Sequence, residues 1–95
     1  MSTNANVRVF VPGPLRMYCD GATELPVAAG SVRAALEQIE RDFPALHRNV
    51  RDETGAVRRH INVFVNSDNV RDLEGLETTV REGDLITILP AVSGG

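Results

Sequence analysis

The sequence contains no lysine and no tryptophan, and its only cysteine is Cys19. One cysteine excludes an internal disulfide, a zinc site made of several cysteines and an iron–sulfur cluster held by a single chain. All ten basic residues are arginine, so the chain has no ε-amine that could be modified or attack an activated group. Compositional drift towards arginine is the simpler explanation of that bias.

Aromatic residues and long apolar runs are also scarce. The four aromatic residues are scattered and the net charge is −3, with acids and arginines interspersed, so the sequence has no footprint of a nucleic-acid-binding surface. No run is long enough to span a membrane, and the first residues lack the basic and apolar regions of a signal peptide. We therefore expect a cytoplasmic protein with no nucleic acid and no membrane among its partners.

The length of 95 residues allows one small domain with a modest core. Apolar residues make up 42% of the chain and charged residues 24%, which is typical of a globular domain. The chain divides into an expected domain over residues 1–90 and a tail over residues 91–95. No internal repeat or linker interrupts the first of these segments.

The C-terminal stretch carries the strongest pattern. A Gly83-Asp84 turn opens an apolar run over 85–89, Pro90 ends it, and Ala-Val-Ser leads to Gly94-Gly95. Proline has no backbone donor, so the strand should end there and the chain should leave the domain extended. Two glycines add no Cβ, so we expect a flexible tail that can enter a narrow slot.

Two further segments alternate strictly between apolar and polar residues. Residues 7–11 (VRVFV) and 60–66 (HINVFVN) are predicted strands whose valines and isoleucine face the core. A weaker extended segment is predicted over 17–27 with a tight turn at Asp20-Gly21, and a short return strand is predicted to begin at Val70. A loop or helical turn should follow over 73–79.

One amphipathic helix is predicted between the strands. Ser31 can cap it, and its apolar positions 32, 36, 39 and 43 form a single stripe that would cover a sheet. Pro44 should end the regular helix, with a further turn over 45–49.

The end GDLITILPAVSGG, with HINVFVNSDNVR upstream, resembles the MoaD/ThiS family of ubiquitin-like sulfur carriers over essentially the whole chain. Within that family, VRRHINVFVN, EGLETTVREGD and ILPAVSGG are most similar to the carrier of the thiocarboxylate route to cysteine. The resemblance implies an α+β, ubiquitin-like β-grasp fold. A mixed sheet of four to five strands would be covered by one main helix, with the first and last strands as parallel neighbours at its centre.

The resemblance also implies a function. An ubiquitin-activating-type adenylyltransferase and sulfurtransferase would use ATP to adenylate Gly95 and convert it to a thiocarboxylate, with Gly94 giving access. The acceptor would be a pyridoxal-phosphate (PLP) cysteine synthase, and a metallopeptidase would release the product. The chain itself would be a carrier and not an enzyme, with no bound cofactor. Alternatives are a small subunit of molybdopterin synthase, a carrier for thiosugar or siderophore synthesis, and a ubiquitin-like protein modifier. An inert binding module is a further alternative.

Alternation also predicts a docking surface on the sheet face away from the helix. Apolar side chains are expected there beside an arginine, and the first tail residues should contact the same partner. A register error of one residue would instead place the apolar side chains in the core. The predicted partner-binding residues are Arg8, Phe10, Phe64, Leu85, Leu89, Pro90, Val92 and Ser93.

The remaining candidate side chains indicate no catalytic site. Cys19 has no basic neighbour in sequence and is predicted to be a small buried or half-buried residue. His47 and His60 lack a third ligand or a nucleophile, so we predict neither a metal site nor a catalytic triad, and both are expected at the surface.

Overall fold

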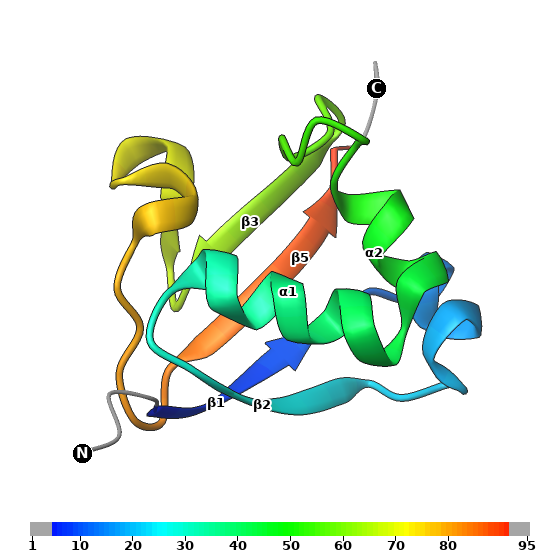
Figure 1. Ribbon diagram of the computed structural model, residues 1–95, viewed down its shortest axis with the longest axis horizontal. Coiled ribbons are helices and arrows are strands. Elements are labelled where there is room, and N and C mark those ends of the chain that lie inside the picture. Colours follow the sequence, from blue (N-terminus) through cyan, green and yellow to red (C-terminus); the bar gives the residue numbers. More distant parts are fainter. Residues whose placement is uncertain (1–4, 92–95) are drawn as a thin grey trace.

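The computed structural model describes residues 5–91, which form a five-stranded sheet with two helices packed on one face (Figure 1). The strand order is β2-β1-β5-β3-β4. The strands are β1 (Ala5–Phe10), β2 (Glu24–Ala29), β3 (Ile61–Val65), β4 (Asp68–Asn69) and β5 (Leu85–Pro90). The helices are α1 (Val32–Asp42) and α2 (Pro44–Val50), and the 3-10 turns are η1 (Gly13–Cys19), η2 (Val70–Asp72) and η3 (Gly75–Glu77).

The first and last strands of the chain are neighbours at the centre of the sheet. Strands β1 and β5 pair in parallel, with Val9 opposite Ile86, whereas β1 pairs with β2 and β3 with both β4 and β5 in antiparallel fashion. Parallel strands need a crossover, and here α1 crosses the sheet between them (Figure 1). This is the β-grasp arrangement that the resemblance implied.

The core lies between the sheet and the two helices. The inward residues of β1, β3 and β5 are almost fully buried, which confirms the alternation predicted for the first two of these strands. The side-chain oxygen of Ser31 accepts a hydrogen bond from the amide of Ala34 at 3.1 Å, and the stripe from Val32 to Ile39 is buried. The predicted helix therefore forms, and the turn expected after Pro44 is the helix α2.

The segment after β1 differs from the prediction. Residues 17–19 belong to η1 and are not extended; β2 begins only at Glu24. Pro14 stands at the start of η1, and this 3-10 helix places Leu15 and Cys19, four residues apart, in the core. The tight turn at Asp20-Gly21 is confirmed, because both residues have positive φ.

The return strand also begins earlier than predicted. It is β4, and Val70 starts η2 because its side chain is 3% exposed and anchors the 3-10 turn in the core. Asn66 adopts φ 55° in the turn between β3 and β4, and its side-chain oxygen accepts from the amide of Leu85. The helical turn expected over 73–79 is η3. Neither described helix is long and apolar enough to cross a membrane.

Candidate functional site

The last strand delivers the chain to one end of the sheet. Pro90 lies opposite Ile61, and the amide of Ala91 donates to the carbonyl of His60 (Figure 1). Pairing therefore continues through Pro90 to Ala91, the first residue of the predicted tail. The predicted tail residues Val92, Ser93, Gly94 and Gly95 lie outside the described residues.

The sheet face away from the helices carries the predicted apolar residues. The strand register places Phe10, Thr87 and Phe64 in one row across β1, β5 and β3. Phe10 and Phe64 are half-buried, whereas the residues on either side of each in sequence are buried. We call this surface, made of Arg8, Phe10, Asn62, Phe64, Leu85, Thr87 and Leu89, the open face.

Leucines flank the aromatic row along β5. Leu85 lies beside Arg8, and Leu89 lies beside Asn62 with 40% of its surface exposed. Their neighbours Ile86 and Ile88 are fully buried on the other face. The register is therefore as predicted, and these apolar side chains are not part of the core.

Arginines border the open face. A nitrogen of Arg8 lies 3.1 Å from a carboxylate oxygen of Glu24 on β2, in an exposed ion pair. The guanidinium of Arg16 lies 5.5 Å from the centre of the Phe10 ring, and its Nε donates to the carbonyl of Val11. Sequence reasoning missed Arg16, because no 3-10 helix was predicted over 13–19 and the residues from 17 onwards were expected to be extended.

A second polar cluster lies near the end of β5. Arg71 of η2 donates through Nη1 to Oδ1 of Asn62 at 2.6 Å and through Nη2 to the carbonyl of Ile61 at 3.0 Å. The side-chain amide of Asn69 also approaches Oδ1 of Asn62, at 3.4 Å. Arg71 and Asn62 come together only because the β3–β4 turn reverses the chain.

The expectation that His47 is exposed was wrong. Its side chain is 9% exposed, and its Nε2 accepts a hydrogen bond from Nε of the buried Arg51 at 2.8 Å. Burial and the neighbouring Arg51 guanidinium lower the pKa of His47 below the usual 6.5, although the carboxylate of Glu40 acts in the opposite direction. His60 is exposed as expected, and Cys19 is buried.

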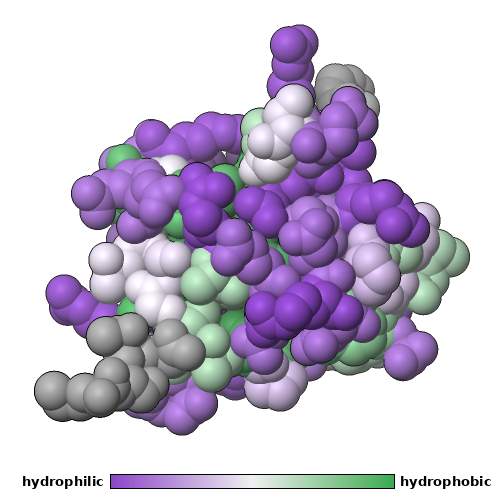
Figure 2. All heavy atoms as spheres, viewed as in Figure 1, coloured by the Kyte–Doolittle hydropathy of each residue, from purple (hydrophilic) through white to green (hydrophobic). Residues whose placement is uncertain are grey.

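The helix-bearing side differs from the open face. Figure 2 shows mostly hydrophilic side chains over the helices, with hydrophobic ones in scattered areas.

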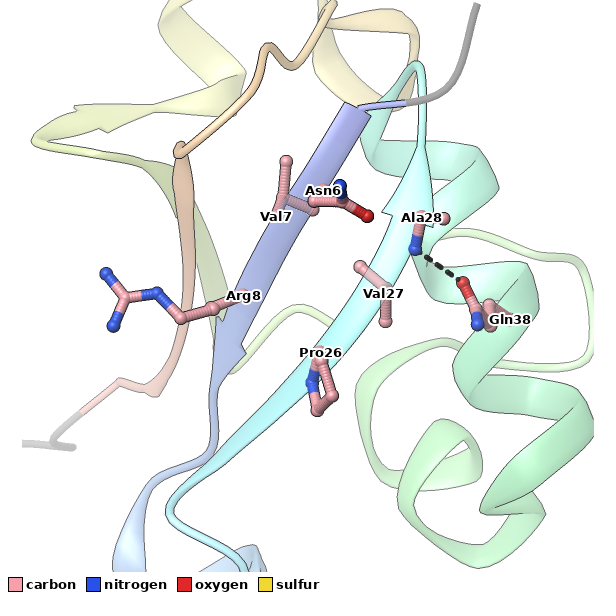
Figure 3. A pocket seen from close by; sticks show the side chains of 7 residues that line it. All are labelled: Asn6, Val7, Arg8, Pro26, Val27, Ala28 and Gln38. Atoms are coloured by element: carbon pink, nitrogen blue, oxygen red, sulfur yellow. Dashed lines mark hydrogen bonds between the residues drawn. The ribbon is translucent and has the colours of Figure 1, made fainter. Parts of the chain in front are cut away.

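A depression of about 420 Å³ lies along β2, between Arg8 on one side and Gln38 of α1 on the other (Figure 3). Its lining includes neither a nucleophile nor an acid–base pair, and Gln38 accepts the Ala28 amide of the edge strand at 3.0 Å. Among residues 5–91, no three potential metal ligands come together.

A family model described as the ThiS family matches residues 9–95, which include nearly all of the fold and the diglycine end. The chain belongs to the ThiS family. The sulfur carrier protein CysO of Mycobacterium tuberculosis is 33% identical over 92 residues, which cover 95% of this chain and 99% of that protein. The β-grasp fold described above is thus the fold of a ThiS-family chain.

Solved structures agree with this assignment. The crystal structure of M. tuberculosis CysO matches 92% of this ThiS-family chain and all of its own, with a TM-score of 0.85 and 31% identity. The BexX/CysO complex of Amycolatopsis orientalis contains a chain that is 37% identical, with a TM-score of 0.82, coverage of 94% of this chain and 99% of that one. The small archaeal modifier protein SAMP1 of Methanosarcina acetivorans is also 37% identical, with a TM-score of 0.83 and coverage of 97% and 98%.

Proposed function

We propose that this protein is a sulfur carrier whose Gly95 cycles between a carboxylate, an acyl adenylate and a thiocarboxylate. The observation that carries the proposal is the position of β5. This central strand remains paired to Ala91, so the four residues that follow begin at the edge of the domain, beside the open face. The match to the ThiS family extends through Gly95.

Gly95 needs activation because a free carboxylate is a poor electrophile. Its oxygen attacks the α-phosphorus of ATP on an activating enzyme, which forms the acyl adenylate and releases pyrophosphate. Hydrosulfide then attacks the acyl carbon and displaces AMP, which leaves a thiocarboxylate and a proton. The sulfur is held on the carrier as a nucleophile, and the ATP is bound by the partner. Gly94 keeps the approach to the acyl carbon free of a Cβ.

The open face supplies the docking surface in this proposal. Exposed and half-exposed apolar side chains beside arginine are typical of the centre and rim of protein–protein interfaces. Phe64 and Phe10 form the centre, Leu85 and Leu89 extend it along β5, and Arg8 lies at the rim. Pro90, Val92 and Ser93 then follow the tail into the partner.

Cysteine synthesis is the pathway that the relatives favour. CysO proteins are similar over almost the whole chain, and one of them forms a complex with BexX, so a carrier of this type is known to dock on a second protein. A PLP-dependent cysteine synthase as acceptor and a metallopeptidase that regenerates the terminus complete the proposed route. The cytoplasm is the proposed compartment. A role in molybdopterin, thiosugar or siderophore synthesis would use the same terminus with another acceptor.

A second candidate function is protein modification. The similarity to SAMP1, whose name describes a modifier, favours it specifically. In that function the activated Gly95 is attacked by a lysine amine of another protein, and AMP leaves. The product is an amide and not a thiocarboxylate.

The two functions are separated by incubating the purified protein with extract of its host, magnesium, ATP and sulfide, followed by intact mass spectrometry. The carrier function predicts a mass increase equal to one oxygen-to-sulfur exchange, dependent on ATP. A variant that lacks Gly95 is the control and should not change. Amide adducts of Gly95 on other proteins, without the thiocarboxylate, would contradict the carrier function and support the modifier.

A further inference from the structure

Asn62 lies on the open face at the end where β5 leaves the sheet. It is paired with Leu89, and the next pair along these strands is Ile61 with Pro90. Paired residues on one face have Cβ atoms about 5 Å apart. Asn62 is therefore a polar neighbour of the segment that leads into the reactive tail.

The orientation of the Asn62 amide is fixed by its neighbours. A guanidinium has only donors, so the atom of Asn62 that faces Nη1 of Arg71 at 2.6 Å has to be the oxygen. The amide of Asn69 lies on the same oxygen. The nitrogen Nδ2 then points the other way, and no residue within 5–91 accepts a hydrogen bond from it.

Arg71 is itself held in place. Its second terminal nitrogen donates to the carbonyl of Ile61, so the guanidinium bridges the main chain and a side chain of adjacent residues on β3. Such a fork spanning two acceptors restricts the side chain more than one bond would. The Asn62 side chain is therefore held by a planar guanidinium that is itself fixed by two hydrogen bonds.

We propose that Asn62 is a specificity-determining residue of the carrier, and that Arg71 is its positioning residue. Nδ2 of Asn62 donates to an oxygen acceptor of the activating enzyme, at the mouth of the channel that receives the tail. The acceptor is a main-chain carbonyl or a carboxylate. This inference rests on the proposed sulfur-carrier function, because it assumes that the tail enters an activating enzyme.

The chemistry of the surroundings supports this assignment. The rest of the open face offers aromatic, aliphatic and arginine side chains, which bind a partner without fixing the register of the tail. A hydrogen-bond donor of fixed direction next to Leu89 fixes the register of the tail. In any other register the buried acceptor of the partner would be left without a hydrogen bond. A shift of the tail by one residue matters because the carboxylate oxygen of one residue, Gly95, has to reach the α-phosphorus.

The test is the rate of ATP-dependent thiocarboxylate formation in host extract with sulfide, measured by intact mass at a series of carrier concentrations. Asn62→Asp keeps the shape and the oxygen that Arg71 binds but removes the donor. We expect its KM to rise about tenfold, in line with the loss of one interfacial hydrogen bond, with little change in kcat. Asn62→Gln, which retains a donor, should recover part of that loss.

Two further variants separate the interaction from charge and from folding. Asn6→Asp makes the same charge change on β1, where Asn6 pairs with Ala28 at the end of the sheet far from the tail exit. This variant should leave KM unchanged. Arg71→Met releases the Asn62 amide and should raise KM less than Asn62→Asp does. High salt should reduce the effect of Asn62→Asp if the acceptor is a carboxylate and leave it if the acceptor is a carbonyl.

The possible results separate a failure of this inference from a failure of the proposed sulfur-carrier function. If wild-type protein reacts and Asn62→Asp has the wild-type KM, this inference is wrong and the carrier function stands. If wild-type protein forms no thiocarboxylate, the carrier function fails and the inference fails with it. A fall in melting temperature for Asn62→Asp without a change in KM would make the Asn62–Arg71 pair purely structural.

Discussion

The two faces of the central strand β5 differ in what they contact. Ile86 and Ile88 are fully buried under the helices, whereas Leu85, Thr87 and Leu89 on the open face are half-buried or exposed. Neighbouring residues of one strand therefore have different roles. The inward set stabilises the fold by burial, at roughly 25 cal/mol per Å² of apolar surface removed from water. The outward set keeps apolar surface in contact with solvent, where a partner can cover it.

This difference predicts effects of different size for two adjacent substitutions. Ile88→Ala should lower the free energy of unfolding by about 2 to 5 kcal/mol, because it removes buried carbon and leaves a cavity. Leu89→Ala should lower it by less than about 1 kcal/mol, since the side chain is 40% exposed. Urea denaturation of both variants measures the difference. Equal losses would mean that the two faces do not differ as described.

The next largest effect is expected on binding. Phe64→Ala should raise the KM for thiocarboxylate formation roughly tenfold to a hundredfold, because aromatic residues at the centre of an interface carry much of its binding energy. Phe64→Ala should lower the free energy of unfolding by less than Ile88→Ala does, because Phe64 is only half-buried. Ile39→Val, at a buried position of α1, is a control that changes core packing without altering the open face. An unchanged KM for Phe64→Ala would remove the open face from the docking surface.

A smaller effect concerns pH and belongs to the helix side. Because His47 is buried and accepts a hydrogen bond from Arg51, its protonated form is disfavoured in the folded state, and its pKa is lowered from 6.5. The unfolded chain then binds more protons than the folded one below about pH 6.5. Stability from this contact is fully present above that pH and is lost as the pH falls towards the lowered pKa.

His47→Gln keeps a side-chain acceptor for Arg51 but cannot titrate in this range. Its unfolding free energy should depend less on pH between about 5 and 7.5 than that of the wild-type protein. The thiocarboxylate reaction measured at about pH 7.5 should be similar for both proteins. The same pH slope in both proteins would show that the His47–Arg51 contact does not couple folding to protonation. Asp52, whose pKa is lowered by hydrogen bonds from Thr54, titrates below this window.

Local pattern predicted much of the fold. Strict alternation gave the strands around Val9 and Val63 with the correct faces, and the capped stripe gave α1, because both patterns are written in adjacent residues. The parallel pairing of β1 with β5 came from the family resemblance. The extended conformation predicted over 17–23 was wrong apart from the turn at Asp20-Gly21, because η1 depends on Leu15 and Cys19 reaching a core formed by distant strands.

The candidate site was predictable where it follows a strand and unpredictable where it depends on tertiary contacts. The open face follows from alternation in β1, β3 and β5. Arg16 over Phe10, Arg71 on Asn62 and the burial of His47 by Arg51 depend on turns and helices that bring residues together. No hydrophobic period in the sequence marks such pairs, although a polar residue such as Asn62 beside an apolar strand end is a weak signal.

The most direct test of the sulfur-carrier function is intact mass spectrometry of the protein isolated from its native host, before and after alkylation, beside a version that lacks Gly95. Cys19→Ser is needed in both so that only the terminus reacts with the thiol reagent. A serine hydroxyl can donate to the Ala22 carbonyl that Cys19 now contacts, so folding should be kept. The sulfur-carrier function predicts a fraction heavier by one oxygen-to-sulfur exchange, alkylated only when Gly95 is present. A terminus found only as amides with other proteins would contradict it.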